Sequence, residues 1–322
     1  MNGWVCCTAS PSLALLKYWG KLEGGDNLPA TPSLAVTLGG LSTRTWVRAG
    51  GADSVTIDGE PQEPDRYSRF FNCVRAALGV AAGFEARSTN SFPTAAGLAS
   101  SSSGFAALAG ACALAAGKEM PAAETSALAR AGSVSAARSV FGGFVLLPAG
   151  ARSAVPVHDR AYWPELRVVV AITQQGRKPV SSRDGMARTA ATSPFFPQWV
   201  AQSQSLLPEA LAALKERDLE KLGDVARASF SMMHATALAA RPSLLYWIPE
   251  TVAVMDACRE LREQGVGAWE TIDAGPQVKI LCHASDVDRV VRRVVERVPQ
   301  VHTLTCFPGD GITITAGEEP PA

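Results

Sequence analysis

A run rich in glycine and serine leads directly into an alanine-rich segment near the middle of the first half of the chain. Four consecutive serines occupy positions 100–103, and residues 105–116 are dominated by alanine, the strongest helix former. A glycine-rich turn before a helix presents unpaired N–H groups and the positive end of the helix dipole, and serine hydroxyls add small donors. The pattern indicates either a polyphosphate-binding turn or a serine-capped helix, for which one serine would be enough.

Other motifs of nucleotide and hydrolytic chemistry are missing from the sequence. Gly117-Lys118 is followed by Glu119, so no Walker A motif is formed, and neither a G-x-S-x-G nor an H-E-x-x-H pattern occurs. The histidines have no metal-ligand spacing, so we expect ordinary surface or core roles for His158, His234, His283 and His302. Nucleotide binding at the serine run therefore requires another architecture.

The composition describes a globular protein with a small-molecule partner. The 322 residues are 47% hydrophobic and 19% charged, which suits one large or two ordinary domains. Thirty Lys and Arg balance thirty Asp and Glu, so no basic excess favours nucleic acid or an anionic membrane. The longest low-polarity run, 105–117, is too short to span a bilayer, and no signal-peptide pattern begins the chain. We expect a soluble protein.

The cysteines indicate a reducing compartment. They number seven, are scattered along the chain and never adopt a C-x-x-C spacing. Reduced and mostly buried thiols are typical of cytosolic proteins, so we expect a cytoplasmic location.

Hydrophobic periodicity predicts an α+β chain with a change of pattern near residues 150–165. In the first part we expect strands at 34–38, 43–48, 54–57, 82–91 and 144–147, and helices at 64–78, 105–116, 122–131 and 135–140. In the second part we expect strands at 166–173, 266–273, 278–282, 302–306 and 311–315, and helices at 197–215, 218–238, 243–264 and 285–298.

Four ordered segments together resemble one known family. The run Pro93–Gly104 resembles the phosphate-binding motif of the GHMP kinases, and its sequence is most similar to the form of that motif in the mevalonate diphosphate decarboxylase family. Leu16–Lys21 is similar to that family's N-terminal signature, residues 132–139 with Gly142-Gly143 to its central one, and Thr271–Pro276 to its C-terminal one. The resemblance thus covers most of the chain in the expected order.

The resemblance implies a two-domain GHMP-kinase fold with the active site in the cleft between domains. Residues 1–160 would form the N-terminal domain with the ATP-phosphate loop, and residues 161–322 the C-terminal domain with the catalytic aspartate. The implied reaction phosphorylates the 3-hydroxyl of mevalonate 5-diphosphate with ATP, after which phosphate and carbon dioxide leave to give isopentenyl diphosphate. ATP and Mg²⁺ are the implied cofactors, with the metal carried by the nucleotide, and a homodimer is implied.

The resemblance also implies roles for individual residues. Asp273 would orient or deprotonate the 3-hydroxyl, Lys17 would pair with Asp273, and Arg138 would clamp the substrate carboxylate with its planar fork. Further residues are matched to the substrate side: Tyr18 and Lys21 at the 5-diphosphate, with Arg75, Ser133, Ser135 and Ser193. The residues matched to the ATP phosphates are Pro93, Ala96, Gly97, Leu98, Ala99, Ser100, Ser101 and Ser102.

The sequence departs from the family pattern at two places. Ser12 stands where the family commonly has asparagine, and Thr31-Pro32-Ser33 replaces an Asn-Ser-Ser run. Both changes fall on the expected substrate side, so three alternatives stay open. These are decarboxylation of mevalonate 5-phosphate, a mevalonate 3-kinase that stops at phosphorylation, and a silent paralogue that binds nucleotide without catalysis.

Overall fold

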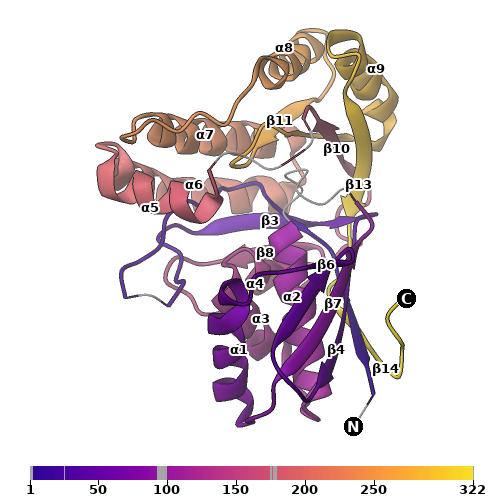
Figure 1. Cartoon of the computed structure of the whole chain (residues 1–322). Coiled ribbons are helices and arrows are strands. Elements are labelled where there is room, and N and C mark those ends of the chain that lie inside the picture. The colour runs from indigo at the N-terminus through magenta and orange to yellow at the C-terminus, as the bar shows by residue number, and fades with distance from the viewer. Residues whose placement is uncertain (1–2, 25, 93–99, 175, 177–179, 322) are drawn as a thin grey trace.

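The computed structural model describes residues 3–24, 26–92, 100–174, 176 and 180–321. One sheet has the strand order β14-β1-β4-β7-β5-β6. Its strands are β1 (Val5–Ala9), β4 (Thr43–Ala49), β5 (Ser54–Ile57), β6 (Glu60–Pro61), β7 (Phe84–Asn90) and β14 (Thr313–Ala316). The helices packed with it are α1 (Asp65–Leu78), α2 (Ser100–Ala115) and α3 (Ala122–Gly132), in the lower half of Figure 1.

Helix α2 is the centre of this lower core. Its alanines lie fully buried between the sheet and the neighbouring helices, together with Phe70, Phe71 and Phe84. A helix that is apolar all round is a buried helix, and small side chains let it approach the sheet closely. The alanine-rich composition thus fixes the N-terminus of α2, and with it the serine run, against the protein interior.

A second sheet has the order β11-β12-β10-β13-β3-β8-β9, with β2 paired to β3. Its strands are β2 (Ser12–Ala14), β3 (Ser33–Gly39), β8 (Phe144–Leu147), β9 (Val155–His158), β10 (Leu166–Ile172), β11 (Trp269–Ile272), β12 (Val278–His283) and β13 (His302–Pro308). The helices of the second half are α5 (Ser182–Thr192), α6 (Phe196–Glu216), α7 (Leu219–Leu238), α8 (Pro249–Glu263) and α9 (Val287–Arg297). The short α4 (Ala136–Ser139) and the 3₁₀ turn η1 (Ala284–Asp286) complete the elements.

Strand β10 separates two hydrophobic cores in the upper half of the molecule. Val168 and Val170 face the core shared with α6 and α7, whereas Val169 and Ala171 face the core shared with α8 and α9. Alternation of side chains along a strand produces this division. The sheet is therefore covered by helices on both faces, as Figure 1 shows for its upper part.

Each of the two sheets contains strands from both sides of the predicted domain boundary. Strand β13 pairs with β3 through Phe307 and Gly39, and the final strand β14 returns to pair with β1 through Ala316 and Val5. In Figure 1 the yellow C-terminal strand accordingly lies beside the indigo N-terminal one. The division at residue 160 stays a prediction, and the pairing adds that the last strand of the second segment belongs to the first sheet.

Most predicted elements are confirmed, and the differences have local causes. The helix predicted at 243–264 begins only at Pro249, because Ile248 is extended, as residues before proline tend to be. Helix α2 begins five residues before the predicted start, so the serines 100–103 form its first turn rather than a loop. Helix α5 and the strands β1, β2, β6 and β9 were not among the predicted elements.

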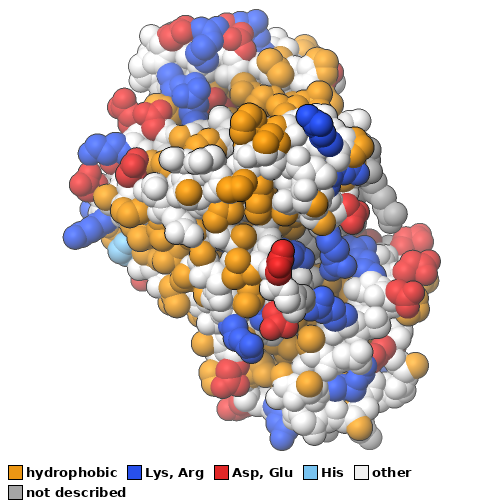
Figure 2. Space-filling model, turned by 90° about the vertical axis from the view of Figure 1, so that its left-hand side faces the viewer, with side chains coloured by type: hydrophobic (Ala, Val, Ile, Leu, Met, Phe, Trp, Pro, Cys, Tyr) orange, Lys and Arg blue, Asp and Glu red, His pale blue; other side chains and the backbone are white. Residues whose placement is uncertain are grey.

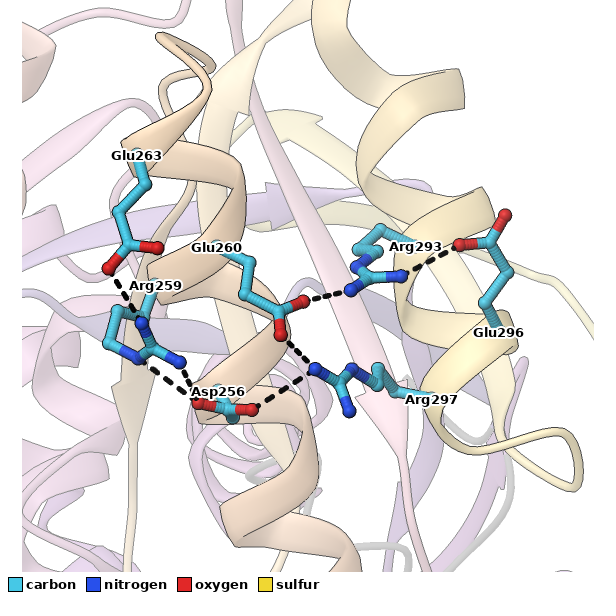
Figure 3. Close-up of polar contacts among 7 residues, drawn as sticks. All are labelled: Asp256, Arg259, Glu260, Glu263, Arg293, Glu296 and Arg297. Carbon is cyan, nitrogen blue, oxygen red and sulfur yellow. Dashed lines mark hydrogen bonds and ion pairs between the residues drawn. The ribbon is translucent and has the colours of Figure 1, made fainter.

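Charged side chains on the surface are mixed in sign. Figure 2 shows Lys and Arg interspersed with Asp and Glu, while hydrophobic side chains gather across the middle of that face. Figure 3 shows a network between α8 and α9 in which Glu260 pairs with both Arg293 and Arg297, and Asp256 pairs with Arg259 and Arg297. Such exposed pairs contribute little individually. No helix among the described residues is long and apolar enough to cross a membrane.

Candidate active site

A half-buried carboxylate held by two lysines lies where the ends of several elements meet. Asp273 follows β11, and its Oδ1 lies 2.6 Å from Nζ of Lys17 while its Oδ2 lies 3.1 Å from Nζ of Lys279. Lys17 follows β2 and is fixed further: its Nζ donates to Ala14 O at 2.8 Å, and its backbone N–H donates to Ser229 Oγ at 2.8 Å. The Lys17 and Lys279 side chains are 2% and 3% exposed, whereas that of Asp273 is 31% exposed. The carboxylate is the part of this cluster that opens toward solvent.

The charge states of this cluster follow from burial and proximity. Burial alone would raise the pKa of Asp273, but the charges of Lys17 and Lys279 outweigh it and hold that pKa well below its usual range. Burial lowers the pKa of Lys17 to about 8 against the opposing effect of Asp273, and the charges of Lys279 and Arg138 lower it further. At neutral pH the cluster therefore contains an ionised carboxylate among cations.

Arg138 lies in the same region with its guanidinium fixed by two serines. Its Nε donates to Ser12 Oγ at 3.2 Å and its Nη1 donates to Ser33 Oγ at 2.6 Å, and the residue is 2% exposed. Burial lowers the pKa of Arg138 to about 10, with Asp273 and Tyr18 acting in the opposite direction. Two hydrogen bonds hold the guanidinium plane, and the fork keeps further N–H donors for a carboxylate.

One of the residues that depart from the family pattern, Ser12, contacts the arginine, as does Ser33, which follows the departing pair Thr31-Pro32. Ser12 on β2 and Ser33 on β3 each accept a hydrogen bond from Arg138. Ser12 also connects to the serine run, because its backbone N–H donates to Ser102 Oγ at 3.2 Å. The departure at Ser12 therefore retains polar contacts in the site.

The serine run divides into two parts in the structure. Ser100 and Ser101 lie in the first turn of α2 and are half-buried and exposed, respectively, whereas Ser102 and Ser103 are fully buried. Ser103 Oγ contacts Thr43 Oγ1 at 2.6 Å, which anchors the turn to β4. The first turn holds no acidic residue, as a polyphosphate site requires. The matched residues Pro93, Ala96, Gly97, Leu98 and Ala99 lie outside the described residues.

A second group of cations surrounds Lys21. Burial lowers the pKa of Lys21 to about 8, and the nearby charges of Arg183 and Arg69 lower it further. Its Nζ donates to Asn27 Oδ1 at 2.5 Å, which fixes the ammonium. Sequence reasoning did not single out Arg69 or Arg183. Arg69 lies on α1, six residues before the chosen Arg75, and Arg183 lies on α5.

Tyr18 presents a buried hydroxyl near Arg138. Among the described residues no partner lies within hydrogen-bond distance of its Oη. Burial raises the pKa of the phenol, so it stays a protonated donor. A buried unpaired donor is costly, which fits a ligand that binds there.

Three other matched residues have local partners in the structure. Ser133 Oγ lies 3.1 Å from Ser135 Oγ, so these two matched serines are brought together just before Arg138. Ser193 is buried after α5, and its Oγ accepts from the backbone N–H of Phe195 at 3.4 Å.

Arg75 has polar partners of its own in the structure. Its Nη1 donates to both carboxylate oxygens of Asp53 at 2.9 Å, and its Nη2 donates to Asn72 Oδ1 at 2.7 Å. The guanidinium is thus engaged at the C-terminal end of α1, and its role in substrate binding stays an untested prediction.

His234 and Lys279 are the buried residues near the carboxylate to which sequence reasoning gave no role. His234 on α7 lies near the backbone of Ile272 and Asp273, and burial, with the charge of Lys17, lowers its pKa to about 4. The imidazole is therefore neutral. Lys279 lies six residues after Asp273, outside the motif Thr271–Pro276. Only the pairing of β11 with β12 shows that it lies close to the Asp273 carboxylate.

Metal ligands are not gathered at the site. Among the residues that the structure describes, no group of three or more His, Cys, Asp or Glu side chains could hold a metal ion. The arrangement of buried cations, one ionised carboxylate and a serine-rich helix N-terminus defines a site for phosphoryl transfer to a strongly anionic substrate.

Comparisons with known proteins agree with this class. Residues 9–157 match the diphosphomevalonate decarboxylase-like N-terminal domain, and residues 168–315 match the mevalonate 5-diphosphate decarboxylase C-terminal domain. Diphosphomevalonate decarboxylases of Aspergillus fumigatus and Candida albicans are each 33% identical, over 85% and 88% of this chain and 75% and 85% of their own. The chain belongs to the diphosphomevalonate decarboxylase family.

Solved structures confirm the two-domain GHMP-kinase fold expected from the resemblance. Mevalonate diphosphate decarboxylase from Staphylococcus aureus superposes with a TM-score of 0.91 at 33% identity, covering 98% of both chains. The enzyme from Enterococcus faecalis gives 0.89 at 34% identity, covering 97% of this chain and 99% of its own. A complex of MDDEF with MVAPP, AMPPCP and magnesium gives 0.91 at 34% identity, covering 97% and 99%.

Proposed function

We propose that this protein catalyses the ATP-dependent decarboxylation of mevalonate 5-diphosphate to isopentenyl diphosphate, with release of ADP, phosphate and carbon dioxide. The observation that carries the proposal is the ionised Asp273 between Lys17 and Lys279, with Arg138 fixed nearby. A tertiary alcohol needs an oriented acceptor for its proton and cations for the charge that develops on the transferred phosphoryl group. These residues supply both.

In the proposed reaction Asp273 accepts a hydrogen bond from the 3-hydroxyl and aligns its oxygen with the γ-phosphate of ATP. Because the two lysines keep the pKa of Asp273 low, the carboxylate orients the hydroxyl and accepts its proton only as the oxygen–phosphorus bond forms. Lys17 lies where it can neutralise charge on the transferring group. The carbon–oxygen bond to phosphate then breaks.

Arg138 holds the carboxylate that leaves. Its remaining N–H donors suit the two carboxylate oxygens, and its bonds to Ser12 and Ser33 fix the direction from which it binds them. As phosphate departs, the electron pair of the carbon–carbon bond forms the double bond, and carbon dioxide is released. Arg138 positions the carboxylate for this step.

The nucleotide and its metal fit the other end of the site. Ser100, Ser101 and Ser102 at the start of α2 would hold the ATP phosphates, as serine hydroxyls and a helix N-terminus suit anions. Mg²⁺ would be bound by nucleotide oxygens, in keeping with its usual reliance on phosphates and water. The related complex with AMPPCP and magnesium supports ATP and Mg²⁺ as cofactors.

The cations around Lys21 favour the diphosphate over the monophosphate substrate. Lys21, Arg69 and Arg183 provide more donors and charge than a single phosphate requires. The intact pair of Lys17 and Asp273 favours a decarboxylase over the mevalonate 3-kinase and over the silent paralogue. Ser133 and Ser135 would complete the substrate pocket, to which Arg75 and Ser193 are matched by resemblance alone.

The substrate is tested by offering purified protein ATP and Mg²⁺ with mevalonate, its 5-phosphate and its 5-diphosphate separately. We expect ADP and carbon dioxide in equal amounts from the 5-diphosphate, because phosphorylation and decarboxylation are coupled. Higher kcat/KM with the 5-phosphate would favour the monophosphate decarboxylase. ADP without carbon dioxide would favour the 3-kinase, and neither product would favour the silent paralogue.

We also propose that the protein is a homodimer in the cytoplasm. The dimer is inferred from the family resemblance, and the location from seven cysteines that are all free thiols, six of them buried. Light scattering of the purified protein is expected to give twice the chain mass of 33.8 kDa. A mass of 33.8 kDa that stays constant with concentration would contradict the dimer.

A further inference from the structure

Lys279 reaches the catalytic carboxylate from the strand next to it. Strands β11 and β12 are antiparallel, and Lys279 lies opposite Thr271, two residues before Asp273. Its neighbours Val278 and Ile280 belong to the core under α8 and α9, so alternation along β12 turns Lys279 to the other face of the sheet. There its Nζ lies 3.1 Å from Oδ2 of Asp273 and 3.5 Å from Gln277 O.

Buried positive charge at this place exceeds what one carboxylate can balance. Lys17, Lys279 and Arg138 are 1%, 3% and 2% exposed, and Asp273 is the carboxylate facing them. Each buried cation has a desolvation cost and is repelled by like-charged neighbours. Stability therefore does not explain the presence of a third cation here. A function in the reaction explains it, because the substrates bring several negative charges.

We propose that Lys279 is a positioning residue for the reaction: it fixes Oδ2 of Asp273, so that Oδ1 and Lys17 face the reacting hydroxyl together. This inference rests on the proposed function of the same site. With one lysine on each oxygen the carboxylate has one orientation, whereas with Lys17 alone it could rotate away from the hydroxyl.

The other groups around the carboxylate do not replace this contact. Tyr18 is a protonated phenol, His234 on α7 is neutral, and Arg138 on α4 donates to Ser12 and Ser33. Lys279 additionally acts on Lys17, because two nearby ammonium groups repel each other and the pKa of Lys17 falls.

The test compares two substitutions at Lys279 with one matched control. Lys279→Met removes the charge while keeping an unbranched apolar stem, and Lys279→Arg keeps the charge. Lys118→Met makes the same change at an exposed position after α2, away from Asp273. Steady-state kinetics with mevalonate 5-diphosphate and ATP are measured over pH 6 to 10, together with urea unfolding.

In Lys279→Met we expect kcat to fall on the order of 10- to 100-fold, as displacement of a reacting group does, with both KM values changed less than about threefold. Loss of the Lys17 proton lowers kcat/KM at alkaline pH. In Lys279→Met we expect this decrease at higher pH, because removal of the like charge of Lys279 raises the pKa of Lys17. Lys279→Arg should recover part of kcat, and Lys118→Met should equal the unsubstituted protein. A native kcat and pH profile in Lys279→Met would overturn the inference. A fall in kcat that accompanies lost stability at an unchanged pH profile would also overturn it.

Urea unfolding gives a readout that does not need activity. Lys17 has a folded pKa of about 8 against 10.5 for a free lysine, so the unfolded chain binds more protons between these values and stability rises with pH there. We expect this rise to be smaller in Lys279→Met and unchanged in Lys118→Met. An equal rise in the unsubstituted protein, Lys279→Met and Lys118→Met would contradict the proposed coupling, whether or not the protein releases carbon dioxide. An unsubstituted protein that releases no carbon dioxide would reject the proposed function instead.

Discussion

Asp273→Asn is expected to lower ATP-dependent carbon dioxide release by about 1,000-fold or more, since the variant loses the carboxylate that orients and deprotonates the 3-hydroxyl. The substitution also leaves Lys17 and Lys279 without their counter-ion at side-chain exposures of 2% and 3%. Breaking a buried pair in this way costs about 3 kcal/mol of unfolding free energy. The structure therefore indicates that loss of Asp273 affects both activity and stability, which kinetic assays and urea unfolding separate.

Glu270→Gln is the matched control for this change. Glu270, three residues earlier on β11, is a buried carboxylate that pairs with Arg227 at 2.8 Å and with Arg262 at 2.6 Å. We expect this variant to lose a similar amount of stability while keeping kcat within about threefold, because its cations lie outside the site. Near-normal turnover in Asp273→Asn, or equal loss of kcat in Glu270→Gln, would contradict the catalytic role of Asp273.

Arg138→Lys is expected to lower kcat/KM for mevalonate 5-diphosphate by about 100-fold, with the KM for ATP changed less than about threefold. A single ammonium cannot keep the bonds to Ser12 and Ser33 and also bind both oxygens of a carboxylate. Initial rates with each substrate varied in turn measure the two effects. Ser33→Ala, which removes one of the two anchoring bonds, should show the same pattern with a smaller loss.

Nucleotide affinity decides whether this interpretation of Arg138 is correct. The arginine is linked to the start of α2 only indirectly, through Ser12 and Ser102. A fall in ATP affinity as large as the loss for the diphosphate substrate would place Arg138 at the nucleotide, and the carboxylate clamp would have to be sought elsewhere.

The local sequence was enough to predict most of the fold. The alanine-rich α2, the alternating β3 and β4 and the periodic α6 and α7 carry their structure in their own residues, because helix propensity and hydrophobic period are local properties. The start of α8 was wrong because the effect of Pro249 on the preceding residue was not considered. The exchange of β14 into the first sheet depends on pairing over the whole chain, which no local pattern contains.

The sequence was enough to predict the family and three residues of the proposed reaction, because the motifs around Lys17, Arg138 and Asp273 each keep their spacing within a short segment. The contacts between these residues and their neighbours follow only from the folded chain. It pairs Lys279 with Asp273, lets Arg138 donate to Ser12 and Ser33, and brings Arg69 and Arg183 near Lys21. It likewise set the charge states, since pKa values depend on burial and on neighbours within a few ångströms, and these come from strands and helices distant in sequence.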